Sequence, residues 1–115
     1  MMTGPNELEC DFLGDLAADT HGIWEVFEFV RLHNPNADDE QVFHIGRDLL
    51  SNWAHQGWIS ISESPLYPST ISNVASALQE LDQLGPIATR YFTNAPSIDL
   101  TAKAREDQPW LTRAG

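Results

Sequence analysis

Residues 38–62 read DDEQVFHIGRDLLSNWAHQGWISIS and decide the fold class. The carboxylate of Asp38 can cap a helix, and apolar residues then recur at helical spacing. That stripe consists of Val42, Ile45, Leu49 and Trp53, flanked by Phe43 and Leu50. Gly57 stands where a left-handed C-cap is wanted, and residues 58–62 alternate apolar and polar like a half-buried strand. The stretch therefore predicts a helix followed directly by a strand.

Two more helices are predicted on the N-terminal side of this unit. In residues 7–18 the apolar positions have helical spacing, and they are Leu8, Phe12, Leu13 and Leu16. Thr20 is placed to cap a second helix that runs to about His33. Pro35 ends that helix, because proline has no N–H to donate and the residue before it avoids helical geometry.

A further helix and a second strand are predicted on the C-terminal side. Ser69 can cap a helix over residues 70–84, whose apolar stripe is Ile71, Val74, Ala75, Leu78 and Leu81. Gly85 and Pro86 stop this helix. Residues 87–93, IATRYFT, are rich in residues typical of strands and predict a strand that pairs with the first one.

The two ends of the chain complete the outline. Ser97 is predicted to cap a short polar helix over 98–106, residues 107–115 are expected to form a tail, and residues 1–6 a loose N-terminus. The expected fold is therefore an α+β single domain over residues 1–115, mostly helical, with four to five helices and a small two-stranded sheet.

Composition indicates a globular domain. The chain has 115 residues, of which 42% are hydrophobic, so it can bury a core of its own. No apolar run is long enough to span a membrane, and the first residues lack the features of a signal peptide. The single cysteine, Cys10, cannot form an internal disulfide. A cytoplasmic location and no membrane partner are the expectations.

Charge is the most informative bulk property. Seventeen acidic residues against six basic ones give a net charge of −11, and residues 1–48 hold eleven of the acids but only two of the bases. Nucleic-acid binding requires cations that displace phosphate counterions, so direct contact with nucleic acid is not expected. An acidic surface instead attracts a basic protein, although the excess of acidic residues can also be explained by solubility alone.

The residues that could support catalysis or metal binding form no recognisable site in the sequence. His44 and His55 share one side of a helix but lie about three turns, roughly 16 Å, apart, too far to bind one metal ion. Cys10 is flanked by acids, which raise a thiol's pKa and disfavour a nucleophilic role. His21 and His33 flank the second helix, where histidine is common. No enzyme activity, metal or cofactor is predicted.

The stretches DLAADTHGIWEVFEFVR (15–31) and LLSNWAHQGWISI (49–61), in this order of helices and strands, resemble small bacterial immunity proteins of the contact-dependent growth inhibition type. The two stretches cover about a quarter of the chain. The resemblance implies a cytoplasmic protein that binds and neutralises a cognate toxin domain, commonly a basic nuclease. It carries over no functional residues, because such proteins pair individually with their toxins.

The surface opposite the core of the second helix is the predicted interface. Apolar Phe29 and Leu32 lie there between carboxylates, as an anchor among steering charges would. The complete set of predicted contacts is Glu9, Asp11, Asp15, Glu25, Glu28, Phe29 and Leu32. The alternative is that neighbouring elements cover this helix on most sides. The chain itself is expected to be a monomer or a weak homodimer.

Four other functions stay open. A winged-helix-like regulator would suit a helical core with a small sheet, but a wing follows directly from two adjacent strands, and here the helix over 70–84 separates them. A nucleic-acid mimic would share the acidic surface but would be elongated. Another protein-interaction module or a small enzyme completes the alternatives.

Overall fold

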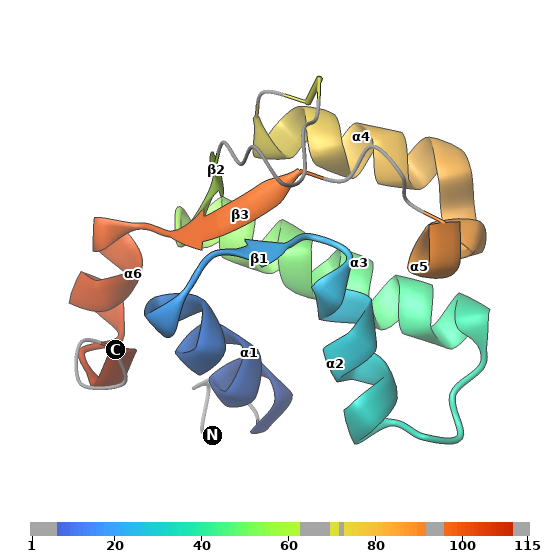
Figure 1. Ribbon diagram of the computed structural model, residues 1–115, viewed down its shortest axis with the longest axis horizontal. Coiled ribbons are helices and arrows are strands. Elements are labelled where there is room, and N and C mark those ends of the chain that lie inside the picture. Colours follow the sequence, from blue (N-terminus) through green and yellow to red (C-terminus); the bar gives the residue numbers. More distant parts are fainter. Residues whose placement is uncertain (1–6, 63–69, 72, 92–95, 112–115) are drawn as a thin grey trace.

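The computed structural model describes residues 7–62, 70–71, 73–91 and 96–111. Its elements, shown in Figure 1, are α1 (Glu7–Ala18), β1 (His21–Gly22), α2 (Glu25–His33), α3 (Asp39–Gln56), β2 (Ile59–Ser62), α4 (Val74–Leu84), the 3-10 turn η1 (Gly85–Ile87), α5 (Ala88–Tyr91), β3 (Ser97–Leu100) and α6 (Ala102–Asp107). The strands form one antiparallel sheet in the order β1-β3-β2. The expected class, a mostly helical α+β domain, is confirmed.

Helix α1 has the predicted bounds and the predicted apolar face. Leu8, Phe12, Leu13 and Leu16 are all buried. The Phe12 ring stacks in parallel on the indole of Trp53, with ring centroids 5.3 Å apart. This contact joins α1 to the middle of the core, since both rings are fully buried.

Helix α3 begins and ends as its sequence predicts. Asp38 accepts a hydrogen bond from the backbone N–H of Gln41, and the Gln41 side chain accepts one from Asp38 N–H, which completes a capping box. Gly57 ends the helix with φ 77°, a left-handed conformation that glycine adopts without steric cost. Strand β2 follows directly, as expected.

The buried face of α3 is rotated from the predicted stripe. Val42 and Trp53 are buried as expected, but Ile45 and Leu49 are only half-buried. Gly46 takes a central place instead, because the ring of Phe27 in α2 packs directly against its backbone. The close approach of α2 explains the rotation.

The predicted start of the second helix is wrong. Thr20 does not cap it, because His21 and Gly22 pair with Ile98 and Ser97 of β3 and form a short strand. The backbone N–H of Ile23 also donates to the carbonyl of Pro96 over 2.9 Å. Helix α2 therefore begins at Glu25, after this pairing, and it ends at His33 as predicted.

The predicted second strand is also wrong. Within residues 87–93, Ala88–Tyr91 form helix α5, which continues from η1; residues 92–93 lie outside the described part of the chain. The strand that pairs with β2 is β3, in the register Ile59 opposite Leu100. Ser97 therefore caps no helix, and the polar helix predicted there, α6, begins later, at Ala102, with Thr101 as its cap. The expected two-stranded sheet has a third strand because β3 also pairs with β1.

The remaining predictions concern α4 and the two ends. The N-cap of α4 is Asn73; the predicted cap, Ser69, lies outside the described residues. Residues 1–6 and 112–115 also lie outside them, and so their predicted looseness stays a prediction. Leu111, within the predicted tail, is fully buried in the core, so that part of the tail is packed. Among the described helices, none is both long and apolar enough to cross a bilayer.

Candidate functional site

Helices α1 and α2 lie side by side at one edge of the molecule (Figure 1), and their outward surfaces carry most of the predicted interface. Two contacts join them: the Phe12 and Phe29 rings meet edge to face, 5.1 Å apart, and His33 Nε2 lies 2.8 Å from Asp11 Oδ2. Glu7, Asp11 and Asp15 are exposed along α1 at a spacing of four residues. That spacing places them on one side of the helix.

Helix α2 adds a carboxylate and an apolar side chain to this surface. Glu28 is exposed, and Leu32 is 76% exposed, the highest value among the large apolar residues described. Phe29 is half-buried against Phe12 and so lies lower in the surface than Leu32. We call the set Glu7, Asp11, Asp15, Glu28, Phe29 and Leu32 the acidic face.

Two of the predicted contact residues have structural partners instead. Glu9 accepts a hydrogen bond from the indole N–H of buried Trp53 over 2.9 Å. Glu25 accepts one from the backbone N–H of Gly22 over 2.7 Å and lies 3.4 Å from His21 Nδ1. Both carboxylates hold the local fold, so we leave them out of the acidic face.

The described basic residues are bound to partners outside the acidic face. Every Arg and Lys in the described part of the chain has a partner, in these pairings: Arg31 and Arg90 with Asp39, Arg47 with Asp82, Lys103 with Asp107, and Arg105 with the backbone carbonyls of Ala17 and Leu111. The hydrogen bond from Arg90, and then that from Arg31, holds the pKa of Asp39 below its usual value. None of these cations pairs with the acidic face, and the imidazole of His33 is the only described side chain in contact with one of its carboxylates, that of Asp11.

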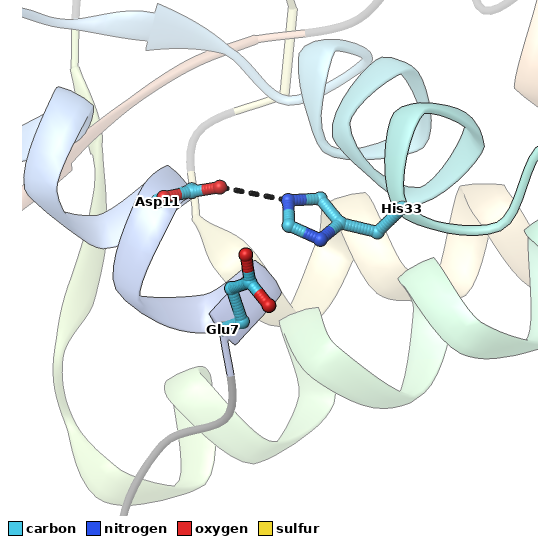
Figure 2. A group of neighbouring side chains, drawn as sticks. All are labelled: Glu7, Asp11 and His33. Carbon is cyan, nitrogen blue, oxygen red and sulfur yellow. Dashed lines mark hydrogen bonds and ion pairs between the residues drawn. The ribbon is translucent and has the colours of Figure 1, made fainter.

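Figure 2 shows how His33 lies against Glu7 and Asp11. The two carboxylates come from successive turns of α1, and His33 is the last residue of α2. One potential ligand atom from each residue falls within 4.8 Å of the others. Sequence reasoning missed this group, because nothing in the sequence places the end of α2 beside the start of α1.

The other sites considered in the sequence are unremarkable. His44 and His55 are exposed, as expected, and His44 lies 3.9 Å from Glu40 on its own helix. Burial, followed by the charges of Glu9 and Asp11, raises the pKa of the Cys10 thiol. A thiol of raised pKa is a poor nucleophile at neutral pH.

Two surface hollows share Asn34 and Ile45 in their lining, and one of them also contains Glu7 of the acidic face. One of about 380 Å³ is lined by Glu7, Leu8, His33, Asn34, Ile45 and Leu49. The other, of about 550 Å³, is lined by Asn34, Pro35, Asn36, Ala37, Gln41, His44 and Ile45. The half-buried side chains of Ile45 and Leu49 therefore line these hollows while they also pack against the core.

Comparison of the chain with models of protein families, with curated proteins and with solved structures finds no match.

Proposed function

We propose that this protein acts by binding a basic protein domain through the acidic face. In keeping with the resemblance to immunity proteins, the bound domain is a toxin whose activity the protein blocks. The protein contributes a charged, partly apolar surface and no catalytic group.

The observation that carries this proposal is the separation of charge between the acidic face and the rest of the molecule. The side-chain carboxylates of Glu7, Asp15 and Glu28 have no ion pair or hydrogen bond with any described residue, while each described Arg and Lys is bound elsewhere. Like charges held together repel one another, so a basic surface that covers them is attracted over a long range. Such complementarity raises the association rate and selects against acidic partners.

The apolar side chains supply what charge alone does not. Leu32 projects from α2 into solvent, and the half-buried ring of Phe29 lies one turn before it. Interfaces gain most of their affinity from a few apolar groups that are shielded from water by a polar rim. Leu32 is therefore the main apolar contact of the proposed interface, and the half-buried ring of Phe29 adds apolar surface beneath it.

A winged-helix-like regulator is the second candidate, and one observation favours it. The order α1-β1-α2-α3-β2-β3, with the sheet order β1-β3-β2, is that of winged-helix domains, with α4 to α5 inserted between the last two strands. The inserted helices do not prevent β2 from pairing with β3. In such domains α3 would enter the DNA major groove.

The surface of α3 argues against contact with DNA. Its exposed residues include Glu40, His44, Asp48 and Asn52, and its only Arg, Arg47, is bound to Asp82. A helix without free cations cannot replace the counterions of phosphate. We therefore assign this scaffold to protein binding, because architecture alone does not determine function.

The test compares two double variants of equal charge. Asp15→Lys with Glu28→Lys reverses charge on the acidic face, and Asp48→Lys with Glu106→Lys reverses the same charge on exposed residues elsewhere. Tagged wild-type protein is used to capture its partner from the source cells, and the purified partner is titrated against all three proteins at low and high salt. Co-expression then measures whether the protein relieves toxicity of the partner.

We expect a basic partner whose affinity for the wild-type protein falls as the salt concentration rises. At low salt, the acidic-face variant should bind this partner at least tenfold more weakly than wild type, a loss of about 1.4 kcal/mol of binding free energy. The affinity of the control variant for the partner should be much closer to that of wild type. Equal binding by both variants would refute the acidic face as the interface. Binding of duplex DNA at physiological salt, without a protein partner, would support the regulator instead.

A further inference from the structure

We propose that Glu7, Asp11 and His33 form a binding site for one divalent transition-metal ion, with Zn²⁺ as the best fit. The site goes beyond the proposed function, because it requires no protein partner. It lies where the first turns of α1 meet the end of α2 (Figure 2).

The three side chains already converge. Asp11 Oδ2 and His33 Nε2 are 2.8 Å apart, and a carboxylate oxygen of Glu7 completes a group within 4.8 Å. Zn²⁺ binds nitrogen and oxygen ligands at about 2.0–2.2 Å, so the ligand atoms of a tetrahedral site lie roughly 3.4 Å apart. Glu7 is exposed, and its carboxylate makes no hydrogen bond or ion pair with a described residue, so this side chain can turn to close the remaining gap.

The charge at the site also fits a cation. Two carboxylates face one imidazole, and no Arg or Lys of the described chain pairs with any of the three. Binding of a metal ion replaces the contact between Asp11 and His33 with bonds from both to the ion. It also brings Glu7, whose carboxylate has no cationic partner among the described residues, into the same site.

The ligand types determine which ion fits. Imidazole nitrogen suits Zn²⁺ and neighbouring transition metals, whereas Mg²⁺ and Ca²⁺ prefer oxygen ligands alone. Three protein ligands leave a coordination position open. The hollow of about 380 Å³, which Glu7 and His33 line together with Leu8, Ile45 and Leu49, provides space for a water molecule or a small ligand there.

The metal would join two helices that are distant in the sequence. Glu7 and Asp11 belong to α1, and His33 lies 22 residues beyond Asp11 at the end of α2. A ligand that binds only the folded arrangement stabilises it in proportion to its affinity and concentration. Zn²⁺ should therefore raise the melting temperature of the protein.

Isothermal titration calorimetry of the full chain with ZnCl2 tests the site. The variants are Glu7→Gln and His33→Gln, and each one replaces a proposed metal-binding side chain that is at least partly exposed to solvent. The matched control is Glu40→Gln with His44→Gln, because this exposed pair also joins a carboxylate to an imidazole, 3.9 Å apart on one helix. Circular dichroism confirms that each variant folds, and Co²⁺ absorption in the visible range provides a second readout.

We expect one Zn²⁺ per wild-type chain, a dissociation constant raised roughly tenfold or more in Glu7→Gln and His33→Gln, and little change in the control. Co²⁺ should give ligand-field bands that His33→Gln loses. No saturable binding by wild type, or equal binding by wild type and His33→Gln, would overturn the site. Neither result bears on the protein partner, because that interaction is measured separately and without added metal.

Discussion

Gly46 shows at the scale of one residue how closely α2 and α3 approach each other. A Cβ at this position would lie 2.6 Å from two ring carbons of Phe27, a fully buried side chain. A glycine inside a helix ordinarily weakens it by about 1 kcal/mol relative to alanine. Here the missing side chain makes room for the neighbouring helix, so the usual benefit of alanine is reversed.

We predict opposite effects for two glycine-to-alanine substitutions. Gly46→Ala should lower the free energy of unfolding by about 1–3 kcal/mol, the usual range for overpacking. Gly14→Ala should raise it by about 0.5–1 kcal/mol, because Gly14 also lies inside a helix and its nearest neighbour, a Trp110 carbon, would be at an ordinary 3.9 Å. Urea denaturation followed by circular dichroism measures both. A stabilising Gly46→Ala would disprove the close approach of α2 and α3.

Glu9 provides a second test at the residue scale. Its carboxylate accepts the hydrogen bond of the buried Trp53 indole. We expect Glu9→Ala to lower the free energy of unfolding by about 1–3 kcal/mol, because the buried N–H loses this acceptor. Glu9→Gln keeps an oxygen acceptor, and its free energy of unfolding should fall clearly less than that of Glu9→Ala. Equal losses in the two variants, measured by urea denaturation, would mean that this hydrogen bond contributes little.

Among the secondary-structure elements, helices α3 and α4 are joined by a bidentate ion pair between Arg47 and Asp82. The guanidinium donates to both carboxylate oxygens over 2.8 and 2.7 Å. These hydrogen bonds hold the pKa of Asp82 below its usual value. Because the folded pKa is lowered, the contact stabilises the fold above the unfolded pKa of about 4, and this stabilisation is lost as the pH falls through the folded pKa.

We therefore predict that the effect of Asp82→Asn depends on pH. At pH 7 the variant should be less stable than wild type by about 1 kcal/mol or less, since the pair is partly exposed to solvent. The difference should begin to shrink as the pH falls below about 4 and should vanish only below the lowered folded pKa of Asp82, where the wild-type carboxyl is protonated in the folded state too. Glu106→Gln, at an exposed residue of α6, is the control and should show no such trend. Urea denaturation across this pH range distinguishes the two.

The strands show why elements near the C-terminus were mispredicted. Residues 87–93 have high strand propensity, yet residues 88–91 are helical; Thr89 caps its own turn by donating to the carbonyl of Pro86 over 2.9 Å. Strand β3 has the weaker pattern Ser-Ile-Asp-Leu, but pairing on both edges and burial of Ile98 and Leu100 hold it extended. Strand propensity is a preference that tertiary contacts override.

At the scale of the whole molecule, the sheet connects the two ends of the chain. The central strand, β3, lies late in the sequence but pairs with β1, which follows the first helix, and with β2. The buried residues Ile98, Ala104 and Leu111 extend the core from the same C-terminal segment. The domain therefore needs this segment to complete its core.

We predict that a chain ending at residue 95 does not fold on its own. It loses the central strand and the three buried side chains, and deletion of a single large core side chain already costs about 2–5 kcal/mol. The expected result is a broad, non-cooperative urea transition by circular dichroism. Addition of a peptide of residues 96–115 should restore a cooperative urea transition. A truncated chain as stable as the full protein would contradict the central role of β3.

The amino-acid sequence alone correctly predicts the α+β class, α1, and α3 with its Asp38 cap and its end at Gly57, because caps and helical spacing act within a few residues of each other. It also identified the acidic N-terminal half and the exposure of Glu28 and Leu32. Contacts between distant parts of the chain make His21 and Gly22 a strand, place β3 at the centre of the sheet and join Glu9 to Trp53 in the core. The same kind of contact brings His33 beside Glu7 and Asp11. Such pairings join residues far apart in the chain, and local preferences carry no information about which distant backbone or side chain will be the partner.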